Sequence, residues 1–375
     1  MRDALNKAAS FIRREAVLCI SVVLALASCC FIAPDKEYLS YIDLRTILLL
    51  FSLMLVVQAF VSAGLFNWAQ NLILARISNA RLLGLVLVAI VFFLSMAVTN
   101  DVALLSFVPF SLMLFSSFDK RDSTFVIVME TIAANLGSMA TPFGNPQNLY
   151  LYSHFELSNS EFFVAVLPSC GLSLVLLVIL CLTHRYSSQS LGSGSGSAAK
   201  PEAKSWAYAA VFVLILLSVI RIVPIQYSAA AAVIVILILN RKVFMKVDYA
   251  LLATFCAFFV FVGNMKRIDA VSEILQANIV GNEYWWGLGM SQIISNVPAA
   301  IMLSGFASDI KALLLGVDVG GLGTLIASLA SLISFKGYTA RRKGEGLYYL
   351  GVFTLWNLVF LAVLAPLSYF ALKVF

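Results

Sequence analysis

One apolar stretch, residues 124–151, is long enough to cross a lipid bilayer but contains a polar interruption at residues 135–148. The interruption combines two glycines and two prolines with hydroxyl and amide side chains, namely Ser138, Thr141, Asn145, Gln147 and Asn148. Proline lacks a backbone donor and glycine adopts dihedrals that other residues avoid, so a regular helix is expected to unwind here. Within a membrane the freed backbone groups must face protein or a water-filled cavity. The stretch therefore predicts a broken spanning helix with an ion or substrate site near the midplane; a proline kink or an extramembrane loop is the simpler alternative.

Composition places this interruption in a membrane protein. Of the 375 residues, 61% are hydrophobic and 12% are charged, which excludes an ordinary soluble domain and predicts an all-α polytopic membrane protein. The net charge of +6 comes from basic residues in short loops between apolar segments, so it does not indicate a nucleic-acid partner. The six cysteines lie within apolar segments without metal-ligand spacing, and we expect buried thiols. The first apolar run, residues 16–33, lacks a convincing cleavage site and is expected to span the membrane.

Two further breaks predict re-entrant hairpins. The apolar segments 82–98 and 102–117 are joined only by Val98-Thr99-Asn100-Asp101, which is too short for an ordinary extramembrane loop. The segment 286–308 contains Ser295-Asn296-Val297-Pro298 in its middle. We therefore expect hairpins at 82–117 and 286–308 whose tips end partway across the membrane.

The distribution of basic residues gives the orientation. With a cytoplasmic N-terminus, and with each hairpin returning to its own side, 18 of the 25 Lys and Arg residues face the cytoplasm and 7 face outside. Cytoplasmic loops of membrane proteins carry this excess of positive charge. The same count places the C-terminus outside, and threading either hairpin as a single crossing would invert every later loop.

This topology predicts two inverted repeats, an architecture common among secondary transporters. The expected units are an N-terminal repeat at 1–184 (hairpin 82–117, broken helix 124–151), a flexible cytoplasmic linker at 185–205, an unpaired transmembrane helix at 206–227, and a C-terminal repeat at 228–375 (hairpin 286–308, broken helix 316–335). Residue matches support the division. Thr99-Asn100-Asp101 corresponds to Ser295-Asn296-Val297, and Gly137–Thr141 corresponds to Gly320–Thr324, which also sets Asn135 against Asp318 and Asn145 against Ser328.

The hairpin tips are the predicted binding sites. Helix ends leave carbonyls that suit Na⁺, and helix starts leave amides that suit an anion. The residues expected to bind substrate are Asn100, Thr141, Asn145, Asn296 and Thr324. Those expected to serve cation coupling are Thr99, Asp101, Ser138, Ser295 and Asp318, and a Na⁺ site is expected from Thr99, Asn100, Asp101, Ser295 and Asn296. An asparagine at a helix start is also a common cap, and the two roles are compatible.

Three acidic residues in the apolar segments need a role. Asp101 stands at the predicted midplane, where a carboxylate is costly; it is expected to ligate a cation, to carry a proton, or only to cap the following helix. Asp318 either caps the second broken helix or joins a second cation site. Glu130 is a weaker candidate that faces either the site or the cytoplasmic vestibule.

The sequence gives little support to an enzymatic function. The two histidines, His154 and His184, fall at opposite membrane faces in this topology, and no HExxH pattern is present. A channel is the better alternative to a transporter, although polar breaks are more typical of occluding sites than of a continuous pore.

The two hairpin tips, together with Thr141-Pro-Phe-Gly-Asn-Pro-Gln-Asn148 and Gly320–Thr324, resemble the ion transporter superfamily. That superfamily includes divalent-anion/sodium symporters, citrate transporters, arsenite permeases and NhaD-type antiporters. The resemblance covers nearly the whole chain and implies a scaffold part and a transport part, a homodimer and elevator-type alternating access. In the carboxylate symporters the tips carry Ser-Asn-Thr, which binds sodium and carboxylate; here Asp101 and Val297 replace hydroxyl residues, which weakens a dicarboxylate assignment.

The sequence thus predicts a secondary transporter of the bacterial-type inner membrane that moves a small anion, either a carboxylate or an inorganic oxyanion. Na⁺ or H⁺ is the expected coupling ion, and no other cofactor is expected. A Na⁺/H⁺ antiporter that uses Asp101 is the first alternative, and an anion channel is the second.

Overall fold

The structure, a computed structural model, describes residues 15–66, 68, 79–187 and 202–374. Every regular element in these ranges is helical, as expected from the apolar segments. In the first half these elements are α2 (Ala16–Cys29), α3 (Tyr38–Tyr41), α4 (Leu44–Ser62), α6 (Ala80–Val98), α7 (Asn100–Leu114), α8 (Lys120–Ser138), α9 (Pro146–His154) and α10 (Asn159–Thr183). The second half contains α11 (Ser205–Val219), α12 (Ile225–Asn240), the 3₁₀ helix η1 (Arg241–Lys246), α13 (Tyr249–Lys266), α14 (Asp269–Ile279), α15 (Glu283–Ile294), α16 (Asn296–Ser304), α17 (Ile310–Val319), α18 (Leu329–Arg341) and α19 (Gly346–Val374).

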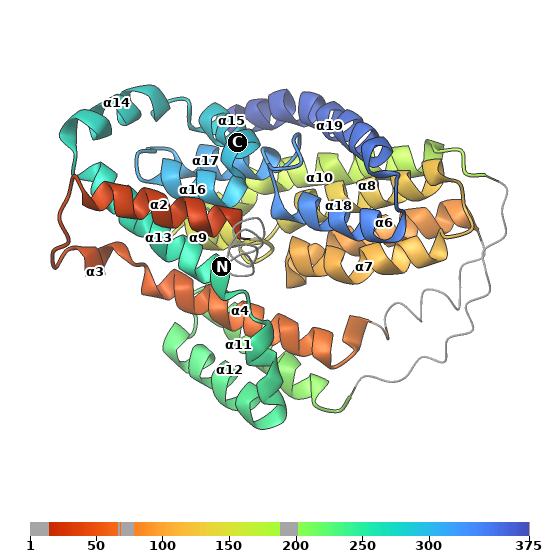
Figure 1. The fold of residues 1–375 in the computed structure, drawn as a ribbon, viewed down its shortest axis with the longest axis horizontal. Helices are drawn as coiled ribbons and strands as arrows, with labels where there is room; N and C mark the ends of the chain where they lie inside the picture. The colour runs from red at the N-terminus through yellow and green to blue at the C-terminus, as the bar shows by residue number, and fades with distance from the viewer. Residues whose placement is uncertain (1–14, 67, 69–78, 188–201, 375) are drawn as a thin grey trace, which may run out of the picture.

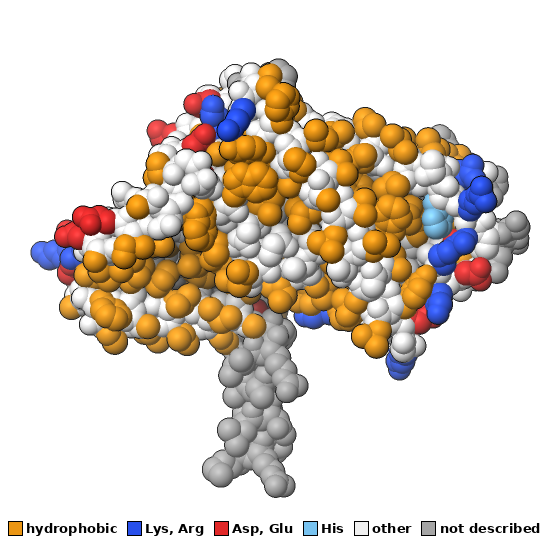
Figure 2. Space-filling model, turned by 90° about the horizontal axis from the view of Figure 1, so that it is seen from above, with side chains coloured by type: hydrophobic (Ala, Val, Ile, Leu, Met, Phe, Trp, Pro, Cys, Tyr) orange, Lys and Arg blue, Asp and Glu red, His pale blue; other side chains and the backbone are white. Residues whose placement is uncertain are grey.

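Six of the described helical segments are long and apolar enough to span a bilayer: α4, α6, α10, α12 with η1, α13 and α19. Their surfaces carry many exposed large hydrophobic side chains, which in water would be a liability but in lipid are the expected exterior. Figure 2 shows such side chains across one face of the molecule, with charged groups towards its margins. The prediction of an all-α polytopic membrane protein is confirmed.

The helices pack in two groups (Figure 1). We call α2, α4, α11, α12 and α13 the frame, because α2 packs on α13 while α11 and α12 pack on α4. We call α6–α10 and α15–α19 the bundle, in which α6 and α7 pack on α8, α15 and α16 pack on α17, and α10 packs on α19. The two groups meet mainly where α4 packs on α9 and α13 packs on α16. Both groups contain helices from both halves of the chain, so the halves interlock.

The helix breaks lie where the polar sequences predict them. A single residue, Thr99, separates α6 from α7, and Ser295 alone separates α15 from α16. Thr99 and Ser295 have positive φ angles of 78° and 76°. A residue with a side chain is strained in this conformation and must be held by its surroundings. That both hairpins are re-entrant, and that they belong to inverted repeats, stays a prediction.

The two longer breaks are also present, with different outer boundaries. α8 begins at Lys120, ahead of the expected start at 124. The second broken helix, α17 followed by α18, covers residues 310–341, well beyond the expected 316–335. The irregular segments are 139–145 and 320–328. The glycine-rich part of the expected linker, residues 188–201, lies outside the described residues. The expected unpaired helix at 206–227 corresponds to α11 and the first residues of α12, and this domain division stays a prediction.

Candidate functional site

The two single-residue breaks are held by the same set of contacts. The backbone N–H of Asn100 donates to the Gly144 carbonyl at 3.2 Å, and that of Asn296 donates to the Ala327 carbonyl at 2.9 Å. Each asparagine side chain also accepts from the next backbone N–H, Asp101 in one case and Val297 in the other, at 2.9 Å. The tip asparagines therefore begin α7 and α16 while tying each tip to the irregular segment of its own half.

The two threonines predicted to bind substrate secure these same segments. The Thr141 hydroxyl donates to the Met96 carbonyl at 2.6 Å, and the Thr324 hydroxyl donates to the Gln292 carbonyl at 3.0 Å. These carbonyls are in the last turns of α6 and α15, where no intrahelical partner is available. Gln292 itself donates to the Gly320 and Leu322 carbonyls at 2.8 and 2.9 Å. The substrate role of the two threonines stays a prediction; their hydroxyls act structurally in this conformation.

A buried polar network joins the two halves at the centre of the bundle. The Asn135 side-chain oxygen accepts from the Asn100 amide at 3.3 Å and from the Ser328 hydroxyl at 2.9 Å. The Asn135 amide donates to the Gly321 carbonyl at 3.4 Å. A Cβ added at Gly321 would lie 3.1 Å from the Asn296 amide nitrogen. Asn100 and Asn296 thus approach the same central point from opposite halves of the chain.

Asp318 forms the second part of this network. It is 2% exposed in the last turn of α17, and its Oδ1 accepts from the Asn145 and Gln147 amides, both at 3.2 Å. The Asn145 amide also lies 3.3 Å from the Ser138 hydroxyl. Asp318 Oδ2 has no hydrogen-bond partner, and neither has Asn148 Oδ1, although both atoms are buried. The Asn148 side chain lies within hydrogen-bonding reach of Asp318, so the two side chains share one region.

A cavity of about 270 Å³ opens between the frame and the bundle. Thr99, Asp101 and Asn145 line it from the bundle, and Lys246 and Asp248 line it from the frame. The remaining lining is mostly apolar and comes from α4, α7, α9, α13, α18 and the irregular segment 139–145. Asp101 Oδ1 is buried without a partner, whereas Asp248 caps α13 by accepting from the Leu251 N–H at 2.9 Å. The cavity therefore presents one basic and two acidic side chains beside a helix break.

Ser295 lies in a different place from the other predicted sodium ligands. It lines a smaller cavity of about 120 Å³ with Val297 and Pro298, between the bundle helices α16 and α18 and the frame helices α2 and α13. Its hydroxyl lies 3.4 Å from the Ala327 carbonyl. Thr99 and Asp101 line the larger cavity, while Asn100 and Asn296 lie in the network between the two. A single site built from all five residues stays a prediction.

Sequence reasoning did not select five residues that the structure brings to this region: Asn135, Gln147, Asn148, Lys246 and Asp248. Asn135 was detectable, because the match between the halves sets it against Asp318. Gln147 and Asn148 stand within the polar interruption itself. Lys246 and Asp248 had no local signal, since only the packing of η1 and α13 brings them to the cavity.

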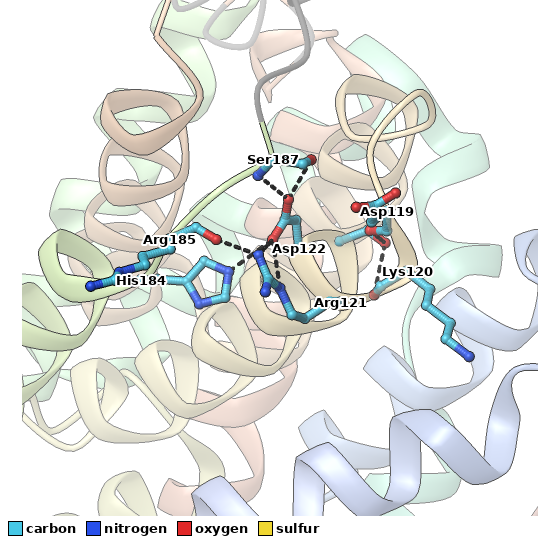
Figure 3. A network of polar contacts seen from close by, with 8 residues as sticks. Asp119, Lys120, Arg121, Asp122, His184, Arg185 and Ser187 are labelled. Atoms are coloured by element: carbon cyan, nitrogen blue, oxygen red, sulfur yellow. Dashed lines mark hydrogen bonds and ion pairs between the residues drawn. The ribbon is translucent and has the colours of Figure 1, made fainter.

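A separate polar cluster fixes the first turn of α8 (Figure 3). Asp122 accepts from the Ser187 N–H at 2.8 Å, from the Ser187 hydroxyl at 2.7 Å and contacts His184 Nε2 at 3.0 Å. Burial opposes the charged form of Asp122, but these hydrogen bonds outweigh it and hold its pKa below the usual range. Burial also lowers the pKa of His184 despite the neighbouring carboxylate. The cluster ties the end of α10 and the start of the linker to α8.

Comparison with known proteins agrees with this architecture. Residues 5–333 match the model of the citrate transporter family. The chain is 30% identical to the inner membrane protein YbiR of Escherichia coli over 310 residues, which cover 82% of this chain and 83% of that protein. It is 29% identical to the uncharacterized transporter MJ0456 of Methanocaldococcus jannaschii over 90% of this chain and 93% of the relative. A shorter match, 32% over 153 residues, joins 40% of this chain to 31% of the silicon efflux transporter LSI3 of rice, Oryza sativa.

The family match spans most of the chain and includes both helix breaks of the first half, the tip at Ser295 and the central network. It confirms the resemblance stated from the polar motifs. The chain belongs to the citrate transporter family and is a multi-pass membrane transporter rather than an enzyme.

Proposed function

We propose that this protein is a secondary active transporter that moves a small anion, a carboxylate or an inorganic oxyanion, coupled to Na⁺ or H⁺ by an elevator-type mechanism. The observation that carries the proposal is the cavity between the frame and the bundle, lined by Thr99, Asp101 and Asn145 on one side and Lys246 on the other. It places ionisable groups beside a broken helix, which is where transporters of this architecture bind solutes and coupling ions.

The elevator mechanism is supported by which helices meet. The frame packs on α9 and α16, whereas cavities lie between α4 and α7 and between α13 and α18. If the halves are inverted repeats, the alternative state exchanges these contacts, and α4 then packs on α7 while α13 packs on α18. In the orientation derived from the basic residues, α7 and α18 run toward the cytoplasm. The present arrangement is then the inward-facing state.

An anionic substrate is supported by Lys246 and by two helix starts. Lys246 is the basic side chain in the cavity lining, and the first turns of α7 and α9 begin beside the cavity at Thr99 and Asn145. The positive ends of the two helix dipoles favour negative charge there. The name of the family favours a carboxylate as the first substrate to test.

Cation coupling is supported by the unpaired oxygens. Asp318 Oδ2 and Asn148 Oδ1 are buried without partners, and so is Asp101 Oδ1. Oxygen atoms of this kind, beside unwound backbone, are the ligands that transporters offer to Na⁺ or H⁺. We assign Asp318 to the central network and Asp101 to the cavity as the two coupling carboxylates. The two roles are separable because Asp101 faces the frame and Asp318 does not line the cavity.

The decisive experiment is transport by the purified protein in liposomes, with an imposed Na⁺ or pH gradient and labelled citrate, succinate, phosphate and sulfate. We expect gradient-driven uptake of at least one of these anions, and exchange of that anion across the membrane when no gradient is imposed. Saturation of the rate with substrate, without a single-channel current in planar bilayers, distinguishes a transporter from a channel. Absence of any anion movement, with the protein correctly folded, contradicts the proposal.

A second function, Na⁺/H⁺ antiport, is favoured by one observation. Asp101 and Asp248 line the same cavity, so a cation entering it would meet two carboxylates. Sodium-dependent proton movement in anion-free liposomes, abolished by Asp101→Asn, would support antiport and reject anion symport. We further propose a homodimer in a bacterial-type inner membrane with a cytoplasmic N-terminus, which site-directed labelling of the linker at 185–205 would test.

A further inference from the structure

Another buried acid lies away from both the cavity and the residues that form the central network. Glu130 is in the middle of α8 and is completely buried. Ser111 of α7 donates a hydrogen bond to Glu130 Oε1, while Oε2 has no partner. No lysine, arginine or histidine among the described residues forms an ion pair with it. A carboxylate in such surroundings costs several kcal/mol unless it is paired or neutralised.

Hydroxyl groups surround the same part of α8. Ser334 of α18 and Tyr349 of α19 each have a buried oxygen without a well-formed hydrogen bond. The Tyr349 hydroxyl lies within hydrogen-bonding reach of Ser334 and of Thr131, the residue that follows Glu130. Buried polar atoms are nearly always paired, so the unpaired Glu130 Oε2 beside these hydroxyls points to a missing proton or water. The other titratable groups that face Glu130 are Cys181 of α10 and Tyr186.

Further hydroxyl groups lie between this region and the surface. Tyr338 packs against Tyr349 with ring centroids 4.7 Å apart. The Tyr338 hydroxyl lies 2.7 Å from the Thr124 hydroxyl and donates to Glu345 at 2.7 Å. Glu345 precedes α19, and its side chain is 30% exposed. Groups that can both accept and donate a proton therefore extend from solvent, by way of α18 and α19, toward Glu130.

The fold itself does not require an acid at this position. Leu313 of α17 stands in the same register relative to Asp318 as Glu130 does to Asn135, and it is completely buried as well. In the alignment of the two halves proposed above, one half fills the position with leucine and the other with glutamic acid. A leucine would also avoid the cost of burying a carboxyl group, so packing does not explain Glu130.

We infer that Glu130 is a proton-binding residue of the bundle, loaded and unloaded from the side of Glu345 through the hydroxyls of Tyr338, Tyr349 and Ser334. A proton entering at the Glu345 end is passed on by hydroxyls that each accept one proton and release another, and it ends on Glu130 Oε2; the reverse transfer restores the carboxylate. The proton-binding role of Glu130 does not depend on the proposed function. Only its consequence, that H⁺ is a coupling ion, rests on that function.

Infrared difference spectroscopy of the reconstituted protein, recorded on shifting between alkaline and acidic buffer, tests the inference without any substrate. We expect a carbonyl stretching band of a protonated carboxylic acid that is missing in Glu130→Gln and kept in Glu273→Gln, an exposed acid of α14. Tyr349→Phe should keep the band and slow its appearance at least tenfold after a pH jump. An identical band in wild type and Glu130→Gln overturns the inference, as does an unchanged rate in Tyr349→Phe.

A transport assay then separates this inference from the proposed function. With an anion that the wild type moves, Glu130→Gln should lose accumulation driven by a pH gradient while Glu273→Gln keeps it. If Glu130→Gln accumulates the anion as well as the wild type does, Glu130 has no coupling role, even if the wild type shows the infrared band. If no anion is moved by the wild type, the proposed function fails and the infrared result still decides whether Glu130 binds the proton. Should Glu130→Gln not fold, Ser111→Ala, which removes the hydroxyl donor, should shift the same band, and an unshifted band would contradict the assignment.

Discussion

At the scale of single residues, the acidic side chains of this protein differ by what surrounds them. Asp248 caps α13, and Asp122 in the first turn of α8 accepts hydrogen bonds from Ser187 and contacts His184, so both have a structural explanation. Asp101, Asp318 and Glu130 each keep a buried oxygen without a partner. Unpaired buried carboxyl oxygens lower stability and persist where function requires them. The contrast between these two groups can be tested directly.

Replacing Asp101 by Asn should abolish ion-coupled transport without reducing stability. The substitution removes a charge whose Oδ1 has no partner, so the melting temperature of the purified protein should stay constant or rise, while coupled uptake falls at least tenfold. Asp248→Ala is the comparison variant, because it removes a helix cap in the same cavity, which costs about 1 kcal/mol and should lower the melting temperature. Full coupled transport in Asp101→Asn would show that the carboxylate has no coupling role.

The Asp122 cluster predicts a loss of stability in acid. Burial lowers the pKa of His184, so the folded protein favours the neutral imidazole and stability falls as the pH drops below the unfolded value of about 6.5. The lowered pKa of Asp122 adds a further loss below about pH 4, where the unfolded chain takes up the proton first. The melting temperature of His184→Gln should therefore depend less on pH between 7 and 5 than that of the wild type. Parallel curves would refute this linkage.

At the scale of helices, close backbone approach holds each helix pair together. Gly316 of α17 faces α15, and a Cβ there would lie 2.3 Å from the Tyr284 carbonyl oxygen. Gly351 of α19 has no atom within 4 Å of the same added group. Small residues permit such contacts between membrane helices, where van der Waals packing replaces the hydrophobic effect. The two glycines are therefore equivalent in helix propensity and opposite in packing.

Gly316→Ala should destabilise the protein, and Gly351→Ala should stabilise it. The first forces a backbone displacement that costs about 1–3 kcal/mol, whereas the second gains up to about 1 kcal/mol of helix propensity in open space. Thermal unfolding of both variants in the same detergent measures the difference. Equal melting temperatures would mean that α15 and α17 separate easily, contrary to their close packing.

The sequence predicted the helices and breaks well because their causes are local. Glycine, proline and clustered amides at 135–148 stop a helix whatever its surroundings, and the tripeptides at Thr99 and Ser295 mark breaks of a single residue. The start of α8 was less predictable, because Lys120 and Asp122 are polar. The cluster that holds the first turn of this helix includes Ser187, which lies far along the chain. Lys246 could not be placed in the cavity by any local pattern.

At the scale of the whole molecule, the frame and bundle define a movement that chemical cross-linking can detect. Val61 of α4 and Leu105 of α7 face each other across a cavity of about 230 Å³. In the alternative state proposed here, this gap closes because α4 packs on α7.

A disulfide between Val61→Cys and Leu105→Cys, in a protein whose six native cysteines are replaced, should form during transport turnover and stop it. Reduction should restore the rate. A matched pair that stays together within the bundle, Ser169→Cys with Ser368→Cys on α10 and α19, should cross-link in every condition. Failure of the first pair to cross-link while transport continues would argue against a closing movement between α4 and α7.

The interlocked halves have a consequence for how the protein is made. α4 ends at Ser62, yet its frame partners α11 and α12 are synthesised only from Ser205 onward. The separation along the chain between α2 and its partner α13 is longer still. At a synthesis rate of about 5–20 residues per second, the first helices spend roughly 7–45 s in the bilayer before those partners emerge. Lipid or the insertion machinery must shelter their contact faces during that time, and neither half made on its own would have its native neighbours.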